Sequence, residues 1–188
     1  HFSRRRSEPG QNNRQTQLEF FAVKLSELNA LSEQEAKELF FQNCASDAWV
    51  SRMLESRPYA SKKLLLDTAC LSWLGLSEQD YLQAFDGHPR IGDVQSLKKK
   101  YKHTQQMAIN EQAGIKEAGE EILIGLADLN TRYEDKFGFI FIVCASGKSA
   151  AQMLALLKTR LNNNRSDELV IAREEQKKIF CLRLERML

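Results

Sequence analysis

The chain has 188 residues, of which 43% are apolar and 28% are charged, with only 9 glycines and 3 prolines. This length suits one domain with a full-sized hydrophobic core, and the composition excludes a low-complexity chain or a loop-rich β-sandwich. No window approaches the roughly 18 consecutive apolar residues that a membrane span requires. These counts predict a soluble globular protein with no membrane partner.

The net charge of +2 is unevenly distributed along the chain. Residues 1–17 carry four arginines against one glutamate, so the remainder has a net charge close to −1. A nearly neutral body argues against nucleic acid as a partner, because binding to phosphates needs a basic face. We expect residues 1–17 to be a disordered basic tail, a cloning remnant or the middle of a longer polypeptide. Residues 18–188 are predicted to form the folded domain.

Apolar residues recur at spacings of three and four along most of the chain, which is the period of a helix with one buried face. Ser32 and Glu35 have the spacing of a capping box at a helix N-terminus. Asp47 is expected to cap the next helix, and Gly75 to end the one after it. The pattern predicts helices over residues 18–28, 32–44, 47–57, 61–75, 77–87, 107–115, 122–133, 148–161 and 167–188.

Two of these helices have stripes that predict a buried face. The stripe of the helix over 61–75 consists of Leu64, Leu65, Leu71 and Leu74. The stripe of the last helix consists of Ala172, Gln176, Ile179 and Leu182. Residues 137–144, FGFIFIVC, break the helical period and favour an extended conformation. One extended segment cannot form a sheet alone, so we predict an all-α, single compact multi-helix domain crossed by one short irregular extended segment.

The cysteines and one glycine-rich motif exclude two kinds of site. Cysteines 44, 70, 144 and 181 form no CxxC pair and have no histidine close in sequence, so no zinc site is predicted. They lie in apolar stretches, where reduced and buried thiols are expected, and no signal peptide is visible. We therefore expect a cytoplasmic protein. The motif SGKS lacks the first glycine of a phosphate-binding loop, so Ser149 is expected to cap the following helix instead.

His88 stands in GHPRIG, a glycine-flanked loop that directly follows a predicted helix. The proline after it restricts its backbone to extended conformations. A rigidly placed imidazole suits acid or base catalysis, which depends first on geometry. The other interpretation, a turn histidine bonded to nearby backbone, is equally compatible with the local sequence.

Two further charged residues could belong to a site. Glu111 follows Met107 and Ala108 at helical spacing, so its carboxylate could lie on a largely apolar face, where it would need a ligand or a cation. Ordinary surface exposure is the alternative. Arg160 lies beside the core-like Leu161, either as a surface residue with a buried stem or as the guanidinium of a site.

Five motifs in a fixed order resemble the OHCU decarboxylase family. They are GHPRIGD (87–93), NEQAG (110–114), KFGFIFIVC (136–144), MLALLKTRLNN (153–163) and ELVIAREEQKKIFCLRL (168–184). The resemblance spans about residues 18–185. It implies a cofactor-free all-α lyase that forms homodimers and decarboxylates 2-oxo-4-hydroxy-4-carboxy-5-ureidoimidazoline (OHCU) to (S)-allantoin during urate degradation.

The resemblance also implies which residues act. It makes His88, Glu111 and Arg160 the catalytic residues. The residues that it places against the substrate are Pro89, Ala108, Gln112, Phe139, Ile140, Phe141, Ile142 and Val143. Many members of the family have proline at the position of Ile140 and serine at the position of Ala108. No metal is implied.

Two other classes of function remain as alternatives. The first is a helical ligand-binding or interaction module in which the His88 loop is structural. The second is a nucleic-acid adaptor that uses residues 4–6 and the lysine-rich run at 98–102.

Overall fold

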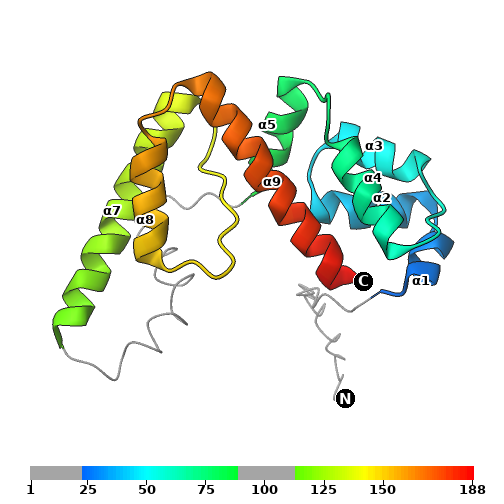
Figure 1. Cartoon of the computed structure of the whole chain (residues 1–188), viewed down its shortest axis with the longest axis horizontal. Coiled ribbons are helices and arrows are strands. Elements are labelled where there is room, and N and C mark those ends of the chain that lie inside the picture. The colour runs from blue at the N-terminus through cyan, green and yellow to red at the C-terminus, as the bar shows by residue number, and fades with distance from the viewer. Residues whose placement is uncertain (1–22, 89–112) are drawn as a thin grey trace, which may run out of the picture.

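The computed structural model describes residues 23–88 and 113–188, and side chains beyond residue 88 from residue 119 onward. The described part is all helical, with no β-strand, which confirms the predicted fold class (Figure 1). Within it, no helix is long and apolar enough to cross a membrane. The helices are α1 (Leu25–Ala30), α2 (Glu33–Asn43), α3 (Asp47–Glu55), α4 (Lys62–Ser72), α5 (Glu78–Asp86), α7 (Ala113–Phe137), α8 (Ala150–Arg160) and α9 (Arg165–Met187).

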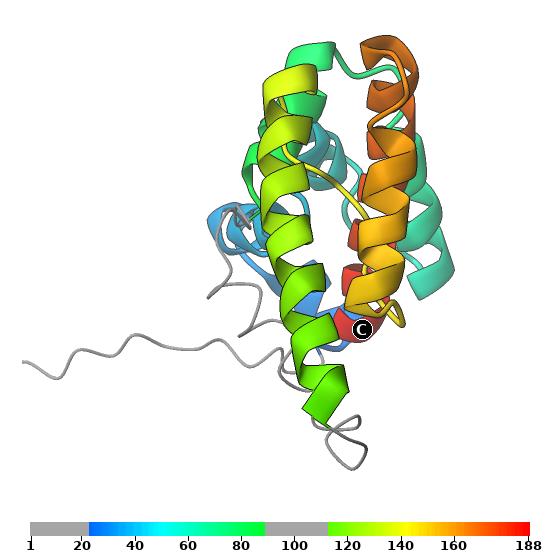
Figure 2. The same cartoon turned by 90° about the vertical axis from the view of Figure 1, so that its left-hand side faces the viewer.

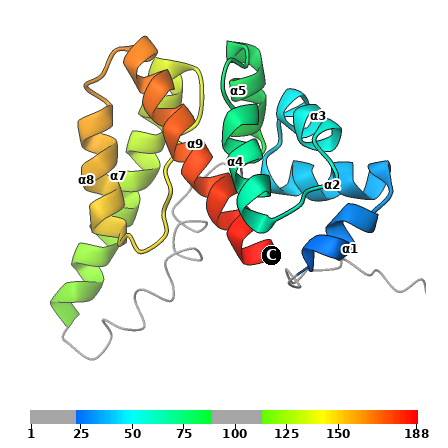
Figure 3. The same cartoon turned by 45° about the vertical axis from the view of Figure 1, so that its right-hand side comes forward.

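The last helix, α9, lies between two groups of helices (Figures 1 and 3). On one side it contacts α2, α4 and α5, and on the other side it contacts α7. We call residues 23–88 the N-terminal region and residues 113–164 the crossover region. Because α9 packs against both, residues from either region can meet on its surface.

The crossover region takes its name from the connection between its two helices. Helices α7 and α8 lie side by side and run in the same direction (Figures 1 and 2). The chain must therefore return along them before α8 can begin, and residues 138–149 make this return between the helix pair and α9 (Figure 1). Gly138 opens the return with φ of +77°, a conformation that side chains disfavour.

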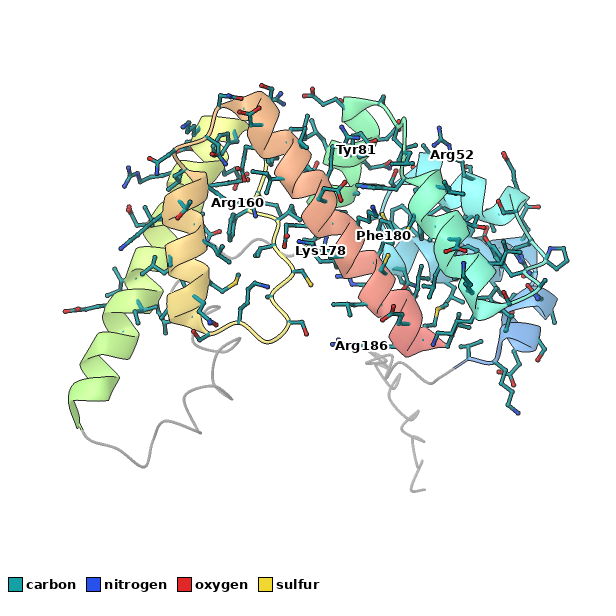
Figure 4. All side chains as sticks on the ribbon, in the orientation of Figure 1. Arg52, Tyr81, Arg160, Lys178, Phe180 and Arg186 are labelled. Carbon is teal, nitrogen blue, oxygen red and sulfur yellow. The ribbon has the colours of Figure 1, made fainter. Side chains whose placement is uncertain are left out.

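Aromatic side chains form the core of the N-terminal region. The ring of Trp49 packs at a right angle to that of Phe40, with centroids 6.2 Å apart. Phe180 of α9 inserts between Trp49 and Trp73, at 5.2 and 5.6 Å from their centroids (Figure 4). Both indole N–H groups donate to backbone carbonyls, Trp49 to Ala69 and Trp73 to α9. The core is thus mainly apolar and its indole N–H groups are satisfied, whereas Oδ1 of Asn43 and Nε of Arg57 are buried without a hydrogen-bond partner.

Several predicted helix starts are confirmed and others are wrong: α1 begins at Leu25 and not at residue 18, and the helix predicted over 122–133 is part of the longer α7, which begins at Ala113. Ser32 accepts the N–H of Glu35 in a capping box, as predicted, and Ser149 caps α8. The cap of α3 is Ser46, whose hydroxyl accepts from the N–H of Trp49, and not Asp47. Asp47 is already the first helical residue, and its carboxylate accepts a hydrogen bond from a side chain of α5.

The predicted buried stripe of α4 is wrong for three of its four leucines. Leu64, Leu71 and Leu74 are 47%, 67% and 52% exposed. The buried face is made by Leu65, Ala69, Ser72 and, just after the helix, Trp73. The helix also ends at Ser72, three residues before Gly75, because the tryptophan must turn into the core. Counting leucines could not show that the smaller Ala69 faces the core.

Helix α9 begins two residues earlier than predicted, at Arg165, with the side chain of Asn164 as its cap. Ala172 and Gln176 are buried as expected, whereas Ile179 is only partly buried. The buried face continues instead through Phe180 and its neighbours at spacings of three and four. Leu182, also predicted on this face, is partly buried.

All four cysteines have free thiols, as expected, but only two are buried. Cys44 and Cys144 lie inside the protein. Cys70 of α4 and Cys181 of α9 are partly exposed, and their sulfur atoms lie 3.5 Å apart. The prediction that every cysteine is buried is therefore wrong for this pair, because it lies at the rim of the contact between two helices.

Candidate active site

The structure describes some of the predicted site residues and not others. His88, Arg160 and residues 139–143 lie within its described part. Pro89, Ala108, Glu111 and Gln112 lie outside it. In the part of the chain with described side chains, no group of three or more His, Cys, Asp or Glu residues could hold a metal ion.

His88 is held by the end of α5. Its backbone N–H donates to the carbonyl of Phe85 at 3.0 Å. The preceding residue, Gly87, approaches the connection between α2 and α3 so closely that a Cβ on it would lie 2.4 Å from the Cβ of Ala45. Only glycine permits this approach. The imidazole is thereby placed next to the end of α2.

The imidazole also contacts α9. Its Nε2 atom lies 2.6 Å from Oε1 of Gln176, whose side chain is fully buried. The amide N–H of Gln176 points to the sulfur of Cys44, 3.8 Å away. Burial raises the pKa of the Cys44 thiol to about 12, so the sulfur is neutral at physiological pH. Gln176 therefore connects His88 to a neutral thiol inside the protein.

Arg160 lies at the end of α8 and is only 6% exposed (Figure 4). Its Nε and one Nη donate to the same carboxylate oxygen of the fully buried Glu168, each at 2.6 Å. The hydroxyl of Tyr133 donates to that oxygen as well. The other Nη donates to the carbonyl of Ile142 at 2.7 Å, and the guanidinium lies 4.6 Å above the ring of Phe141. Most of its hydrogen-bond donors therefore serve acceptors inside the protein.

Residues 138–149, which we call the return segment, are held by side chains at two places, the carbonyl of Ile142 and the backbone of Cys144. Arg160 binds the carbonyl of Ile142, as described above, and the N–H of Cys144 donates to the carboxylate of Glu175 at 2.7 Å. Lys148 donates to the carbonyl of Cys144 at 2.8 Å. In the described ranges, no backbone–backbone hydrogen bond holds residues 139–143. Their remaining main-chain groups are thus available to a ligand or to water.

A second arginine of interest, Arg183 of α9, lies near Cys44. Arg183 follows Gln176 by two helical turns, so the two share a face. Its guanidinium is half-buried and donates to the carbonyl of Asn43 at 3.0 Å. Burial lowers the pKa of Arg183, and no acidic side chain among those that the structure describes is paired with it. Arg183 thus lies near Cys44, and no acidic side chain in the described part of the chain neutralises its positive charge.

Sequence reasoning missed Gln176, Glu168, Glu175 and Arg183. Gln176 had a signal, because a glutamine interrupts an otherwise apolar stripe. The others had none. The partner of Glu168 belongs to another helix, and Glu175 and Arg183 bond main-chain groups 31 and 141 positions away.

The structure described so far is that of a helical protein in which the imidazole of His88 follows a turn that only glycine permits. Its residues 139–143 are neither helical nor part of a sheet. The sequence model of the OHCU decarboxylase family matches residues 29–185. This chain therefore belongs to the OHCU decarboxylase family.

Curated relatives carry the corresponding names. The chain is 33% identical over 144 residues, 77% of its length, to the uric acid degradation bifunctional protein TTL of Arabidopsis thaliana. It is 26% identical over 140 residues to a 2-oxo-4-hydroxy-4-carboxy-5-ureidoimidazoline decarboxylase of Halalkalicoccus jeotgali, covering 74% of this chain and 77% of that protein. The chain spans only 44% of the Arabidopsis protein and 32% of a bifunctional relative from Bacillus sp..

Solved structures agree with this assignment. The crystal structure of an OHCU decarboxylase in the presence of (S)-allantoin superposes with a TM-score of 0.64 at 33% identity, covering 80% of this chain and 96% of that one. A crystal structure of (S)-allantoin synthase superposes with a TM-score of 0.62 at 19% identity, which supports the shared fold.

Proposed function

We propose that this chain decarboxylates OHCU to (S)-allantoin in the degradation of urate. The observation that carries the proposal is the placement of His88. The helix end, Gly87 and Gln176 together give the imidazole of a family-specific motif a fixed position. The crystal structure obtained with (S)-allantoin supports the same substrate class.

The chemistry requires an acceptor for the electrons of the breaking bond, and the substrate contains one. The carbon that carries the carboxylate is adjacent to a ring C=N bond. When CO2 leaves, the bonding electron pair moves into that C=N bond and gives an enediol-like ring. A proton is then added at the ureido-bearing carbon. We therefore propose that the reaction needs no cofactor, and that the protein supplies orientation, charge stabilisation and a proton delivered to one face.

The predicted residues take distinct parts in this proposal. His88 exchanges a proton with the 4-hydroxyl region, and Glu111 accepts hydrogen bonds from the ureido or ring N–H groups. Free main-chain groups of residues 139–143 bind the planar edges of the ring. Pro89, Ala108 and Gln112 line the same site.

The two arginines differ in what they can offer to a negative charge. Arg160 is paired with Glu168 and holds the carbonyl of Ile142. We propose that its guanidinium stabilises the ring oxygen on which negative charge grows, because tight binding of the departing carboxylate would stabilise the ground state. Arg183 is bonded to the carbonyls of Gln42 and Asn43, and we assign it no part in the reaction.

Circular dichroism of freshly generated substrate tests the activity. The spontaneous reaction is slow and gives both enantiomers, so an enzyme should produce an allantoin signal of one sign at a rate proportional to protein concentration. A ligand-binding module would leave the spontaneous course unchanged. A nucleic-acid adaptor would instead bind DNA or RNA with an affinity that falls steeply with salt. Absence of an optically active product would refute the proposal.

Substitution then assigns the residues. His88→Ala should lower kcat by ~10²–10⁴-fold, the usual range for an acid or base group. His103→Ala is the matched control, because His103 stands among lysines and polar residues in the sequence, where we expect a solvated side chain. Arg160→Gln should lower kcat by ~10²–10³-fold, as loss of a charge-stabilising donor does. Arg186→Gln, at an exposed position of α9, should leave kcat unchanged. A His88 variant with nearly full activity would remove the imidazole from the mechanism.

We also propose that the protein is a cytoplasmic homodimer. The four free thiols fit a reducing compartment. Sedimentation equilibrium should give twice the chain mass of 21.6 kDa, and a monomer mass at micromolar concentration would contradict the dimer.

A further inference from the structure

The hydrogen bond between His88 and Gln176 has a direction, and this direction determines which ring nitrogen carries the proton. Neutral imidazole has one N–H donor and one acceptor nitrogen. The carbonyl oxygen of Gln176 lies 2.6 Å from Nε2, and a carbonyl can only accept. Nε2 must therefore be the donor, in the neutral ring as in the protonated one.

The opposite side of the amide agrees with this orientation. The N–H group of Gln176 points to Cys44, and the side chain has no exposure to water. A turned amide would place its N–H against Nε2, which could then accept only while the imidazole is neutral. Protonation would put two donors face to face in a buried site. The observed orientation is the one that suits both protonation states of the ring.

We propose that Gln176 is a positioning residue that keeps a proton on Nε2 of His88, so that proton exchange with the substrate takes place at Nδ1. The exchange rests on the proposed decarboxylation, whereas the tautomer is a property of the folded chain alone. Nδ1 takes up a proton from the substrate's hydroxyl group and returns one to the ring, while the Nε2–H bond to Gln176 persists throughout. The amide does not need to turn during the cycle, and the imidazole stays oriented.

The tautomer can be measured directly in the unmodified protein. Long-range proton–nitrogen NMR correlation on the full chain labelled with 15N-histidine distinguishes the two neutral forms, and the resonances of His88 are assigned with the His88→Ala variant. We expect Nε2 to have the shift of a protonated nitrogen and Nδ1 that of an unprotonated one. A neutral imidazole with its proton on Nδ1 would overturn the proposal without any substitution at Gln176.

Two substitutions at Gln176 separate orientation from packing. Gln176→Met keeps the length of the side chain but removes the acceptor, so the tautomers should mix and kcat should fall by ~10–100-fold with little change in KM, the usual cost of losing a partner that orients a histidine. Gln176→Glu keeps an acceptor oxygen and should restore the Nε2–H form and most of the rate. Gln83→Met is the matched control, because Gln83 lies on α5 and its side chain is hydrogen-bonded to Asp47 of α3. An unchanged tautomer in the methionine variant would refute the role of Gln176.

The measurements also separate this inference from the proposed function. If the NMR result is as expected but the wild-type chain forms no allantoin, the decarboxylase proposal fails and the assignment of Gln176 to the tautomer stands. If the wild-type chain is active but carries the other tautomer, only the assignment of Gln176 fails.

Discussion

The N-terminal and crossover regions pack against the same helix but are stabilised in different ways. In the N-terminal region, aromatic rings from α2, α3 and α9 fill the core, and their polar atoms bond to helix carbonyls. Where the crossover region meets α9, the carboxylate of Glu168 and the guanidinium of Arg160 are buried together, beside a second group of aromatic rings that includes Tyr133. Helices satisfy their own backbone, whereas the return segment cannot. A buried non-helical chain therefore requires polar side chains inside the protein.

The largest effect is expected at the charge pair of the crossover region. Glu168→Gln keeps the volume of the side chain but leaves the Arg160 guanidinium buried without a counter-ion. Removal of one partner of a buried pair should lower the free energy of unfolding by about 4 kcal/mol. Urea denaturation followed by far-UV circular dichroism measures the change. A loss no larger than that of an exposed pair would show that water solvates Arg160.

A smaller loss is expected for a cavity in the N-terminal region. Leu65 is fully buried in α4. Leu65→Ala should lower the free energy of unfolding by about 3 kcal/mol, through lost apolar contacts and the residual void. Leu64→Ala, at the exposed neighbouring position, is the control and should have little effect. Equal effects at the two positions would contradict the buried face that the structure assigns to α4.

Helix caps should contribute alike in both regions. Ser61 accepts the N–H of Leu64 in the N-terminal region, and Ser149 accepts that of Gln152 in the crossover region. Replacement of either serine by alanine should lower the free energy of unfolding by about 1 kcal/mol. Thermal unfolding of the two variants compares them directly. A much larger loss for Ser149 would mean that this cap also holds the return segment.

The smallest effect is expected from Glu175, and it depends on pH. Burial raises the pKa of this carboxyl, but hydrogen bonds from Lys178 and from the N–H of Cys144 outweigh burial and lower it. The folded protein therefore binds the proton less tightly than the unfolded chain, whose pKa is ~4.3. The resulting stability is present above that pH and is lost as the pH falls through the folded-state pKa. Glu175→Gln should flatten this acid limb, whereas Glu174→Gln should keep it, in denaturation series between about pH 6 and pH 3.

The same contrast explains what the sequence could predict. Capping residues such as Ser32 and Ser77 act on neighbours three positions away, so the helices of the N-terminal region could be placed from local spacing. The end of the helical pattern before residues 138–144 could also be predicted from composition, although Phe137, predicted in the extended segment, still belongs to α7. The pair between Arg160 and Glu168 could not, because it depends on how α8 turns into α9.

The candidate site, too, could be predicted only where local sequence determines it. His88 was identified from its motif, and the close approach of Gly87 to Ala45 gives the physical reason for the glycine before it. The orientation of the ring depends on Gln176, 88 positions later, and periodicity alone assigned that glutamine only to a buried face. A pattern in one helix does not indicate which loop will meet it in space.

The shared helix also sets the order in which the protein can mature on the ribosome. Helix α9 supplies Phe180 to the aromatic rings of the N-terminal region and Glu168 to the ion pair with Arg160, and it is the last helix of the described chain to be synthesised. Until residues 165–187 have left the exit tunnel, the indole rings of the first region remain uncovered and Arg160 lacks its counter-ion. Both regions should thus be open to proteases and to chaperones during translation. They should complete their folding at the same time, once α9 has emerged.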